Sequence, residues 1–133
     1  MRLINNGFCK QLPRPEYSSF DKYKSSTNWF EVFEVEKNIW AIYEAFQWSE
    51  VISYLIVGTQ TALLFDTGNG IDNINDVVSQ LTDKPLQVLN SHSHFDHIGG
   101  NYQFKEILSP SSAFSIKNSQ GNHSQQVKTE ASS

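Results

Sequence analysis

The sequence predicts an α+β fold with one mostly antiparallel or mixed β-sheet and one or two helices. Three observations support this prediction: β-rich apolar runs between residues 29 and 65, an amphipathic run over 71–81, and a cluster of histidines directly after a short apolar strand. The 133 residues match the length of one domain. We expect an irregular N-terminal arm over 1–28, a folded unit over 29–108, and a polar, weakly ordered tail over 109–133.

Four β-strands are expected before the helix. Apolar residues alternate with glutamates over 29–36, and Lys37-Asn38 then turns the chain into a second run over 39–46, so the two resemble a hairpin. Residues 51–57 and 61–65 form the third and fourth runs. Because these runs are nearly continuous in apolar residues, we expect strands that are buried on both faces. The N-terminal arm has room for one further short strand.

One helix is predicted over 71–81, where apolar residues recur at helical spacing and Asp72 is the candidate N-cap. Thr82-Asp83-Lys84-Pro85 ends this helix, and a short strand follows over 86–89. Further along, Tyr102–Phe104 is expected to be a short helix and Ile107-Leu108 the start of another strand.

Composition narrows the range of partners and compartments. The formal net charge of −4 and the absence of a Lys/Arg cluster argue against nucleic acid and against an anionic membrane surface as partners. The single cysteine, Cys9, cannot form an internal disulfide, and we interpret it as a free thiol. Neither a signal peptide nor an apolar run of membrane-spanning length is visible, so we expect a cytoplasmic protein.

The strongest chemical signal lies at residues 91–97, Ser-His-Ser-His-Phe-Asp-His. Neutral imidazole is the commonest metal-ligating side chain, and zinc accepts both imidazole nitrogen and carboxylate oxygen. On a strand, His92, His94 and Asp96 would share one face while His97 would point away. We therefore expect a loop that turns all four side chains toward one cavity.

The pattern His92-x-His94-x-Asp96-His97 resembles the signature of the metallo-β-lactamase superfamily. The neighbouring segments are similar too: residues 63–68 resemble the family's strand that ends in an Asp-x-Gly turn, and residues 98–101 resemble its usual continuation. The resemblance covers roughly residues 29–108. It implies the N-terminal half of an αββα sandwich that holds one or two metal ions, usually zinc.

The resemblance also implies a role for each residue of the motif. His92 and His94 would bind a first metal, and Asp96 and His97 a second. Asp96 could also transfer a proton to or from a metal-activated water. Asp66 would lie beside the site and orient it, although an aspartate before Thr67-Gly68 also suits a simple turn.

The motif is not accompanied by the family's remaining ligands. Only one histidine, His123, follows the motif, in a polar segment where we expect an exposed tail residue, and no carboxylate is placed to bridge two metals; Glu130 lies near the end of the tail. Three explanations stay open: a truncated hydrolase, a second chain that supplies the other half, or self-association through an exposed sheet face.

Two metal-binding classes of function remain, beside a purely structural β-rich fragment without metal, which would require the histidine cluster to be accidental. The first is a zinc-dependent hydrolase acting on a small-molecule ester, thioester, amide or phosphoester, complete only when the missing half is present. The second is a non-catalytic metal-binding or interaction fragment. The substrate cannot be inferred from the sequence, but the N-terminal arm and the region of Trp48 are candidates to border a pocket.

Overall fold

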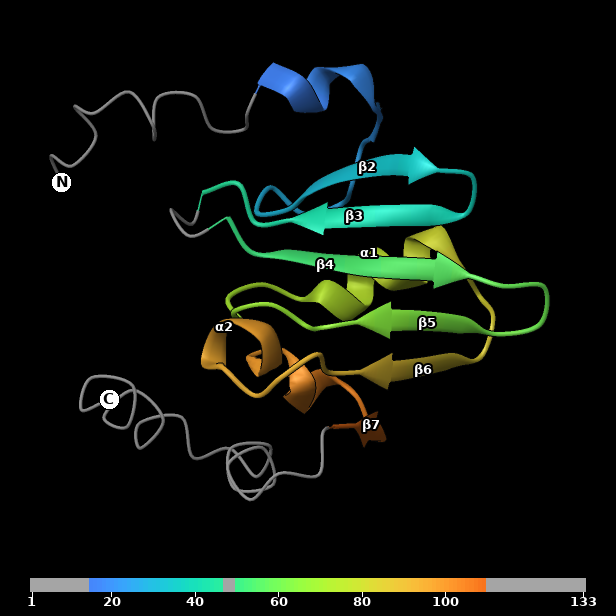
Figure 1. Cartoon of the computed structure of the whole chain (residues 1–133), viewed down its shortest axis with the longest axis vertical. Coiled ribbons are helices and arrows are strands. Elements are labelled where there is room, and N and C mark those ends of the chain that lie inside the picture. Colours follow the sequence, from blue (N-terminus) through green and yellow to red (C-terminus); the bar gives the residue numbers. More distant parts are fainter. Residues whose placement is uncertain (1–14, 47–49, 110–133) are drawn as a thin grey trace, which may run out of the picture.

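A seven-stranded mixed sheet forms the framework of the chain, which the computed structural model describes over residues 15–46 and 50–109 (Figure 1). Strand order follows the chain. Neighbouring strands from β1 to β5 pair antiparallel, whereas β6 pairs parallel with both β5 and β7. The strands are β1 (Asp21–Tyr23), β2 (Glu31–Glu36), β3 (Ile39–Tyr43), β4 (Ile52–Val57), β5 (Ala62–Phe65), β6 (Leu86–Leu89) and β7 (Ile107–Leu108). The predicted α+β class with a mostly antiparallel, mixed sheet is confirmed.

Each predicted strand forms within a few residues of its expected bounds. The hairpin of β2 and β3 turns at Asn38, which adopts a left-handed conformation with φ of 64°. The N-terminal arm contains the one short strand for which the sequence had room, β1, preceded by a 3-10 helix η3 (Pro15–Ser19). Cys9, Trp48, His123, Glu130 and the predicted tail beyond residue 109 lie outside the described residues.

The main helix, α1 (Ile74–Leu81), begins later than the predicted position 71. Its N-cap is Asn73, whose side chain accepts a hydrogen bond from the Asp76 amide at 3.1 Å, so the assignment of Asp72 as the cap was wrong. The Asp72 carboxylate instead accepts the amide of Asn73. Burial explains the choice: Ile74 is enclosed while Ile71 is exposed, so the helix starts where its apolar stripe meets the sheet.

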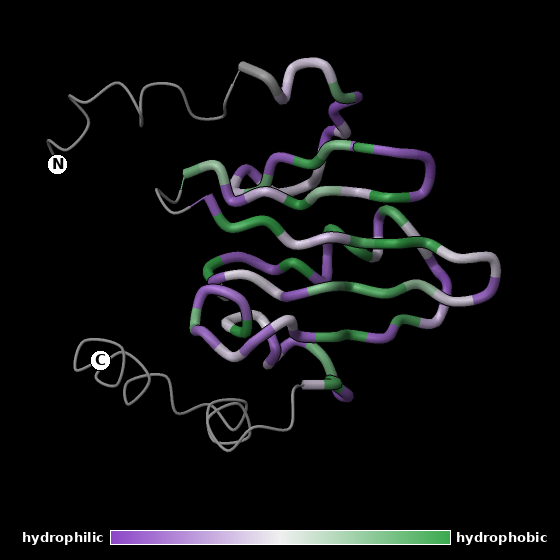
Figure 2. The backbone as a smooth tube through the Cα atoms, viewed as in Figure 1, coloured by the Kyte–Doolittle hydropathy of each residue, from purple (hydrophilic) through white to green (hydrophobic). Residues whose placement is uncertain are grey.

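The larger hydrophobic core lies between α1 and one face of the sheet (Figures 1 and 2). Alternate residues of the central strands point into it because successive side chains of a strand face opposite sides. Its buried members are Phe30, Val32, Ile42, Leu55, Ala62, Leu64, Ile74, Val77, Val78 and Val88. This core fixes the position of β5 and β6, from whose ends the candidate site is built.

The opposite face of the sheet is only partly covered. Tyr17 from η3 packs on Tyr43 and Phe33, with ring centroids 5.4 Å and 6.2 Å apart, but Tyr54 and Ile56 of β4 remain 39% and 40% exposed. The expectation that such strands are buried on both faces was therefore wrong for β4. The reason is that, among the described residues, the only helix packed against the sheet's core is α1, which lies on the other side.

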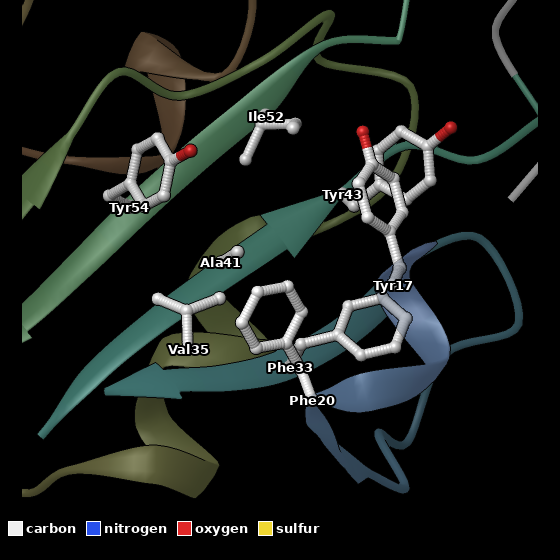
Figure 3. A pocket seen from close by; sticks show the side chains of 8 residues that line it. All are labelled: Tyr17, Phe20, Phe33, Val35, Ala41, Tyr43, Ile52 and Tyr54. Atoms are coloured by element: carbon white, nitrogen blue, oxygen red, sulfur yellow. The ribbon is translucent and has the colours of Figure 1, made fainter. Parts of the chain in front are cut away.

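An apolar hollow of about 260 Å³ lies on this second face, lined mainly by aromatic and aliphatic side chains (Figure 3). Tyr17 and Phe20 border it, in agreement with the expectation that the N-terminal arm lines a pocket. The longest helix of the described residues has eight residues, and none could cross a membrane.

The two faces predict different costs for adjacent truncations on β4. Leu55→Ala should lower the free energy of unfolding by about 2–5 kcal/mol, because Leu55 is fully buried against α1 and its loss leaves a cavity. Ile56→Ala, one residue further on the open face, should cost less than about 1 kcal/mol. Urea unfolding at low protein concentration measures both, and equal costs would contradict the one-sided core.

Candidate metal centre

The site begins where two parallel strands end at the same edge of the sheet. Phe65 of β5 is the register partner of Leu89 of β6, and the Asp66 amide continues the ladder by donating to the Leu89 carbonyl at 2.9 Å. The residues that follow the two strands are therefore neighbours in space, although 25 positions separate Asp66 from Ser91. In this way the Asp-Thr-Gly turn is brought beside the histidine motif.

The carboxylate of Asp66 joins the turn after β5 to the histidine motif. It accepts the Ser91 amide at 2.7 Å, the Ser91 hydroxyl at 2.6 Å and His97 Nδ1 at 2.9 Å. Burial would raise the pKa of Asp66, but the hydrogen bonds from His97 and Ser91 outweigh burial and hold the pKa below its ordinary value. Asp66 also has a φ of 69°, a left-handed conformation that is unfavourable for most residues and that these contacts stabilise.

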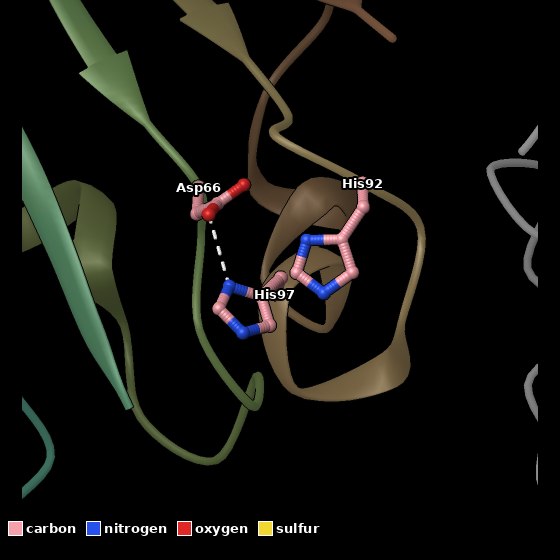
Figure 4. Close-up of side chains that lie close together, drawn as sticks. All are labelled: Asp66, His92 and His97. Atoms are coloured by element: carbon pink, nitrogen blue, oxygen red, sulfur yellow. Dashed lines mark hydrogen bonds and ion pairs between the residues drawn. The ribbon is translucent and has the colours of Figure 1, made fainter. Parts of the chain in front are cut away.

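His97 lies on α2 (Phe95–Ile98), a single helical turn that follows His94. The motif is therefore not the simple loop that we expected over 91–97, because its second half is helical. In Figure 4 the His97 ring turns Nδ1 toward Asp66, and His97 Nε2 lies 3.8 Å from an Asp96 carboxylate oxygen. The hydrogen bond to Asp66, reinforced by the Asp96 charge, raises the pKa of His97 against the opposing effect of burial.

The other two histidines complete a tight cluster. The His92 ring lies 4.2 Å from the His97 ring and 4.5 Å from the His94 ring, centroid to centroid. Burial and the positive charges that His97 and His94 carry when protonated lower the pKa of His92. An imidazole with a lowered pKa stays neutral near pH 7, and only the neutral form can donate a lone pair to a metal.

The donor atoms fall into two overlapping groups, each with atoms within 4.8 Å of one another: Asp66 with His92 and His97, and His92 with His94 and Asp96. Nitrogen and carboxylate donors at this density suit zinc. Asp66 already accepts three hydrogen bonds, one from a histidine ring, which is the usual arrangement of a carboxylate that orients a ligand. The division into a His92/His94 pair and an Asp96/His97 pair stays a prediction.

A network of polar side chains next to the site was not identified in the sequence analysis. Asn90, which is buried, exchanges hydrogen bonds with Asn101 at 2.8 Å and 3.2 Å, and Asn101 also accepts from the Thr67 hydroxyl at 2.8 Å. The Thr67 amide donates to the His97 carbonyl at 2.9 Å. These bonds tie the ends of β5 and β6 to the segment after α2, and no local sequence pattern shows them because their members are 11 to 34 residues apart.

Glu44 was also missed in the sequence analysis. It follows β3, is only 2% exposed, and lies against the Asp66–Gly70 segment. A carboxylate inside the apolar run of residues 39–46 is a departure from the local pattern and could have marked this position in advance.

Comparison with known proteins bears on both the fold and the motif. Residues 48–113 match the family model described as the metallo-beta-lactamase superfamily. The chain is also 33% identical over 54 residues to the probable metallo-hydrolase YqgX of Bacillus subtilis, a match that covers 41% of this chain and 26% of that protein. This chain thus spans about a quarter of the length of that curated relative.

Solved structures share the fold at low sequence identity. A metallo-β-lactamase from Erythrobacter litoralis matches 75% of this chain and 48% of its own length, with a TM-score of 0.56 and 17% identity. The enzyme FIM-1 from Pseudomonas aeruginosa, solved in a mono-zinc form, matches 70% of this chain and 46% of its own length, with a TM-score of 0.52 and 18% identity. The chain therefore spans about half of each of these folds.

The ion pair of Asp66 and His97 predicts a pH-dependent cost for Asp66→Asn in the metal-free protein. The raised pKa of His97 contributes stability below its unfolded value of 6.5, which is lost as the pH rises through the folded pKa. The lowered pKa of Asp66 contributes stability above 3.8, which is lost as the pH falls through its folded pKa. The substitution should therefore cost most between these limits, about 1–3 kcal/mol.

Chemical denaturation in the presence of a chelator, at pH 5.5 and pH 9, measures this difference. Asp83→Asn is the matched control, because Asp83 is exposed and precedes β6, whereas the site follows the other end of that strand. A cost for Asp66→Asn that is as large at pH 9 as at pH 5.5 would contradict the ion pair.

Proposed function

Because this chain is a relative of the metallo-β-lactamase superfamily that resembles its N-terminal half, we propose that it serves as a metal-dependent hydrolase. The convergence of the motif histidines with Asp66 and Asp96 at one edge of the sheet carries the proposal. The proposed cofactor is zinc, as one or two ions, and other divalent metals could take its place. The proposed substrate is a small molecule with an ester, thioester, amide or phosphoester bond.

Each residue of the motif has a proposed role. His92 and His94 hold a first ion, and Asp96 with His97 Nε2 holds a second. Asp66 keeps the His97 ring in place by accepting its Nδ1 proton, and this contact supports the assignment of Nε2 to the metal. Ser91 holds the Asp66 carboxylate through its amide and its hydroxyl.

The chemistry follows from these roles. When bound, zinc lowers the pKa of a coordinated water to about 7 and polarises the oxygen of the bond to be cleaved. The Asp96 carboxylate, about a quarter exposed, is the proposed site at which a proton is taken up and released during the reaction. The His92 ring, whose pKa is lowered, stays neutral and available as a ligand at neutral pH.

Each proposed metal ion would have two protein ligands from this chain, whereas catalytic zinc sites usually have three. We propose that the remaining ligands come from a second chain. A truncated hydrolase stays one interpretation of this arrangement. The proposal includes no nucleic-acid or membrane partner, and the cytoplasmic location is inferred from the sequence alone.

A second candidate function, a non-catalytic metal-binding or interaction module, is favoured by the open face of the sheet. Tyr54 lines the hollow and Ile56 is exposed on the same face of β4, and no charged side chain is among the described residues that line the hollow. A face of this kind is suited to a second apolar sheet rather than to a polar ligand. We propose that this layer comes from another chain, and the simplest source is a second copy of this one.

The hydrolase proposal predicts zinc binding that depends on the motif. Purified chain should bind zinc in a fixed ratio and release product from ester, thioester, phosphoester or β-lactam probes. His94→Ala should reduce both zinc affinity and turnover by about 100-fold or more, because loss of a ligand costs at least as much as loss of a residue that supports one. Competition with a zinc indicator and steady-state assays provide the two measurements.

His123→Ala is the matched control, since this histidine lies outside the motif and is expected not to bind the metal. Zinc binding without turnover would favour the non-catalytic module. The hydrolase proposal fails for this chain if it neither binds zinc nor turns over any probe.

Association through the open face predicts a concentration-dependent mass. Sedimentation velocity should show the wild-type chain moving toward dimer as concentration rises, and Ile56→Lys should shift this equilibrium toward monomer by about tenfold or more, because a charge buried in an apolar contact is costly. Ile71→Lys, at an exposed isoleucine away from the β4 face, is the control and should leave the equilibrium unchanged. A wild-type monomer at all concentrations would exclude self-association and leave a different chain as the partner.

A further inference from the structure

Glu44 is a buried carboxylate that the proposed chemistry does not use. It lies directly after β3, with its amide donating to the Val51 carbonyl at 3.0 Å, so the backbone at this point is held by the neighbouring strand. Within the described residues it forms no ion pair with a lysine or arginine. A buried carboxylate without a cationic partner is costly, so its retention in a core position calls for a compensating interaction.

The compensation comes from two hydrogen bonds. Trp29 Nε1 donates to one carboxylate oxygen at 2.7 Å, and the Asn69 amide donates to the other at 3.0 Å. Gly68 lies directly against this second oxygen, which occupies the place that a Cβ at residue 68 would take. With a φ of +74°, Gly68 also has a conformation that few other residues adopt. The carboxylate is thus fitted to the backbone of residues 68 and 69.

The same short segment is held on its other side by α2 and the residues after it. The Thr67 amide donates to the His97 carbonyl at 2.9 Å, and the Gly99 amide donates to the Gly68 carbonyl at 2.8 Å. A Cβ on Gly99 would collide with the Asn69 carbonyl, so the two backbones are in direct contact. Residues 67–69 therefore lie between Glu44 and the turn that carries His97.

Electrostatics agree with this proximity. Burial, with a further effect of the Asp96 charge, raises the pKa of Glu44 despite its hydrogen bonds to Trp29 and Asn69. The Glu44 charge in turn helps to raise the pKa of His97. Glu44 is thus within electrostatic reach of the site, although it belongs to neither group of candidate metal ligands.

We propose that Glu44 is a positioning residue, which holds residues 67–69 against α2 and thereby fixes the His97 ring and its hydrogen bond to Asp66. This inference rests on the proposed metal site. It gives Glu44, the residue after β3, a role in that site although Glu44 lies outside the histidine motif. Its effect is transmitted through two backbone contacts and does not require Glu44 to touch a metal or a substrate.

Glu44→Gln tests the proposal, because glutamine keeps the shape but has one acceptor oxygen in place of two, so it can accept from only one of the Trp29 Nε1 and Asn69 N–H groups and sets its NH₂ against the other. In the metal-free protein, the NMR signal of the hydrogen-bonded His97 Nδ1 proton should weaken or broaden. Zinc affinity should fall by about tenfold, as for other residues that support metal ligands. Glu36→Gln, at an exposed glutamate at the end of β2, is the matched control and should change neither measurement.

Trp29→Phe provides a second test should Glu44→Gln fail to fold, since it removes the other hydrogen bond but keeps the carboxylate. It should also weaken or broaden the signal of the His97 Nδ1 proton, but less than Glu44→Gln does. A further variant pair uses the steric contact: Gly68→Ala should disturb the His97 signal less in a Glu44→Ala background, where the colliding oxygen is gone, than in the wild type.

The outcomes separate this inference from the proposed function. If the wild type binds no zinc but Glu44→Gln alters the His97 signal, the positioning role stands and the hydrolase proposal fails. If the wild type binds zinc and a folded Glu44→Gln variant matches Glu36→Gln in both measurements, the positioning role is overturned.

Discussion

The site depends on the hydrogen bonds that the carboxylate of Asp66 accepts. This carboxylate receives hydrogen bonds from Ser91 and His97, and so joins the ends of two parallel strands to the one-turn helix that completes the histidine motif. In this position Asp66 has a left-handed backbone conformation. Such a conformation costs of order 1–3 kcal/mol in a residue other than glycine and is retained where surrounding contacts fix the geometry. Without this link, the turn after β5 and the motif after β6 would share an edge of the sheet but would not share a cluster of donor atoms.

The one-sided packing of the sheet is the second constraint. The face under α1 contains a continuous core, whereas the other face is only partly covered by Tyr17 and leaves Tyr54 and Ile56 in contact with solvent. The candidate site lies where β5 and β6 end, whereas the hollow on the open face is lined by residues of β2, β3 and β4 and of the segment around η3. The proposed cover of the open face and the proposed missing ligands are therefore separate requirements, and a partner chain would have to extend past β5 to meet both.

Much of the architecture could be predicted because it depends on local pattern. The strands, the helix and the class of fold follow from apolar spacing and turn residues, and the donor cluster follows from four side chains within six positions. The errors arose where two local solutions competed. Asp72 and Asn73 are both good caps, and only the burial of Ile74 decides between them. An apolar strand such as β4 suits burial on two faces, but the number of faces covered depends on what packs against it.

The sequence by itself determined the types of donor atom, their order along the chain and the strand that precedes them. The tertiary structure alone decided how these groups meet. It paired β5 with β6 in parallel so that Asp66 reached His97, it placed Asp96 and His97 on a helical turn, and it pressed Glu44 against Gly68 and Asn69. The physical reason is that these contacts join residues about 25 to 31 positions apart, and no periodicity or motif within one segment contains information about such a distance.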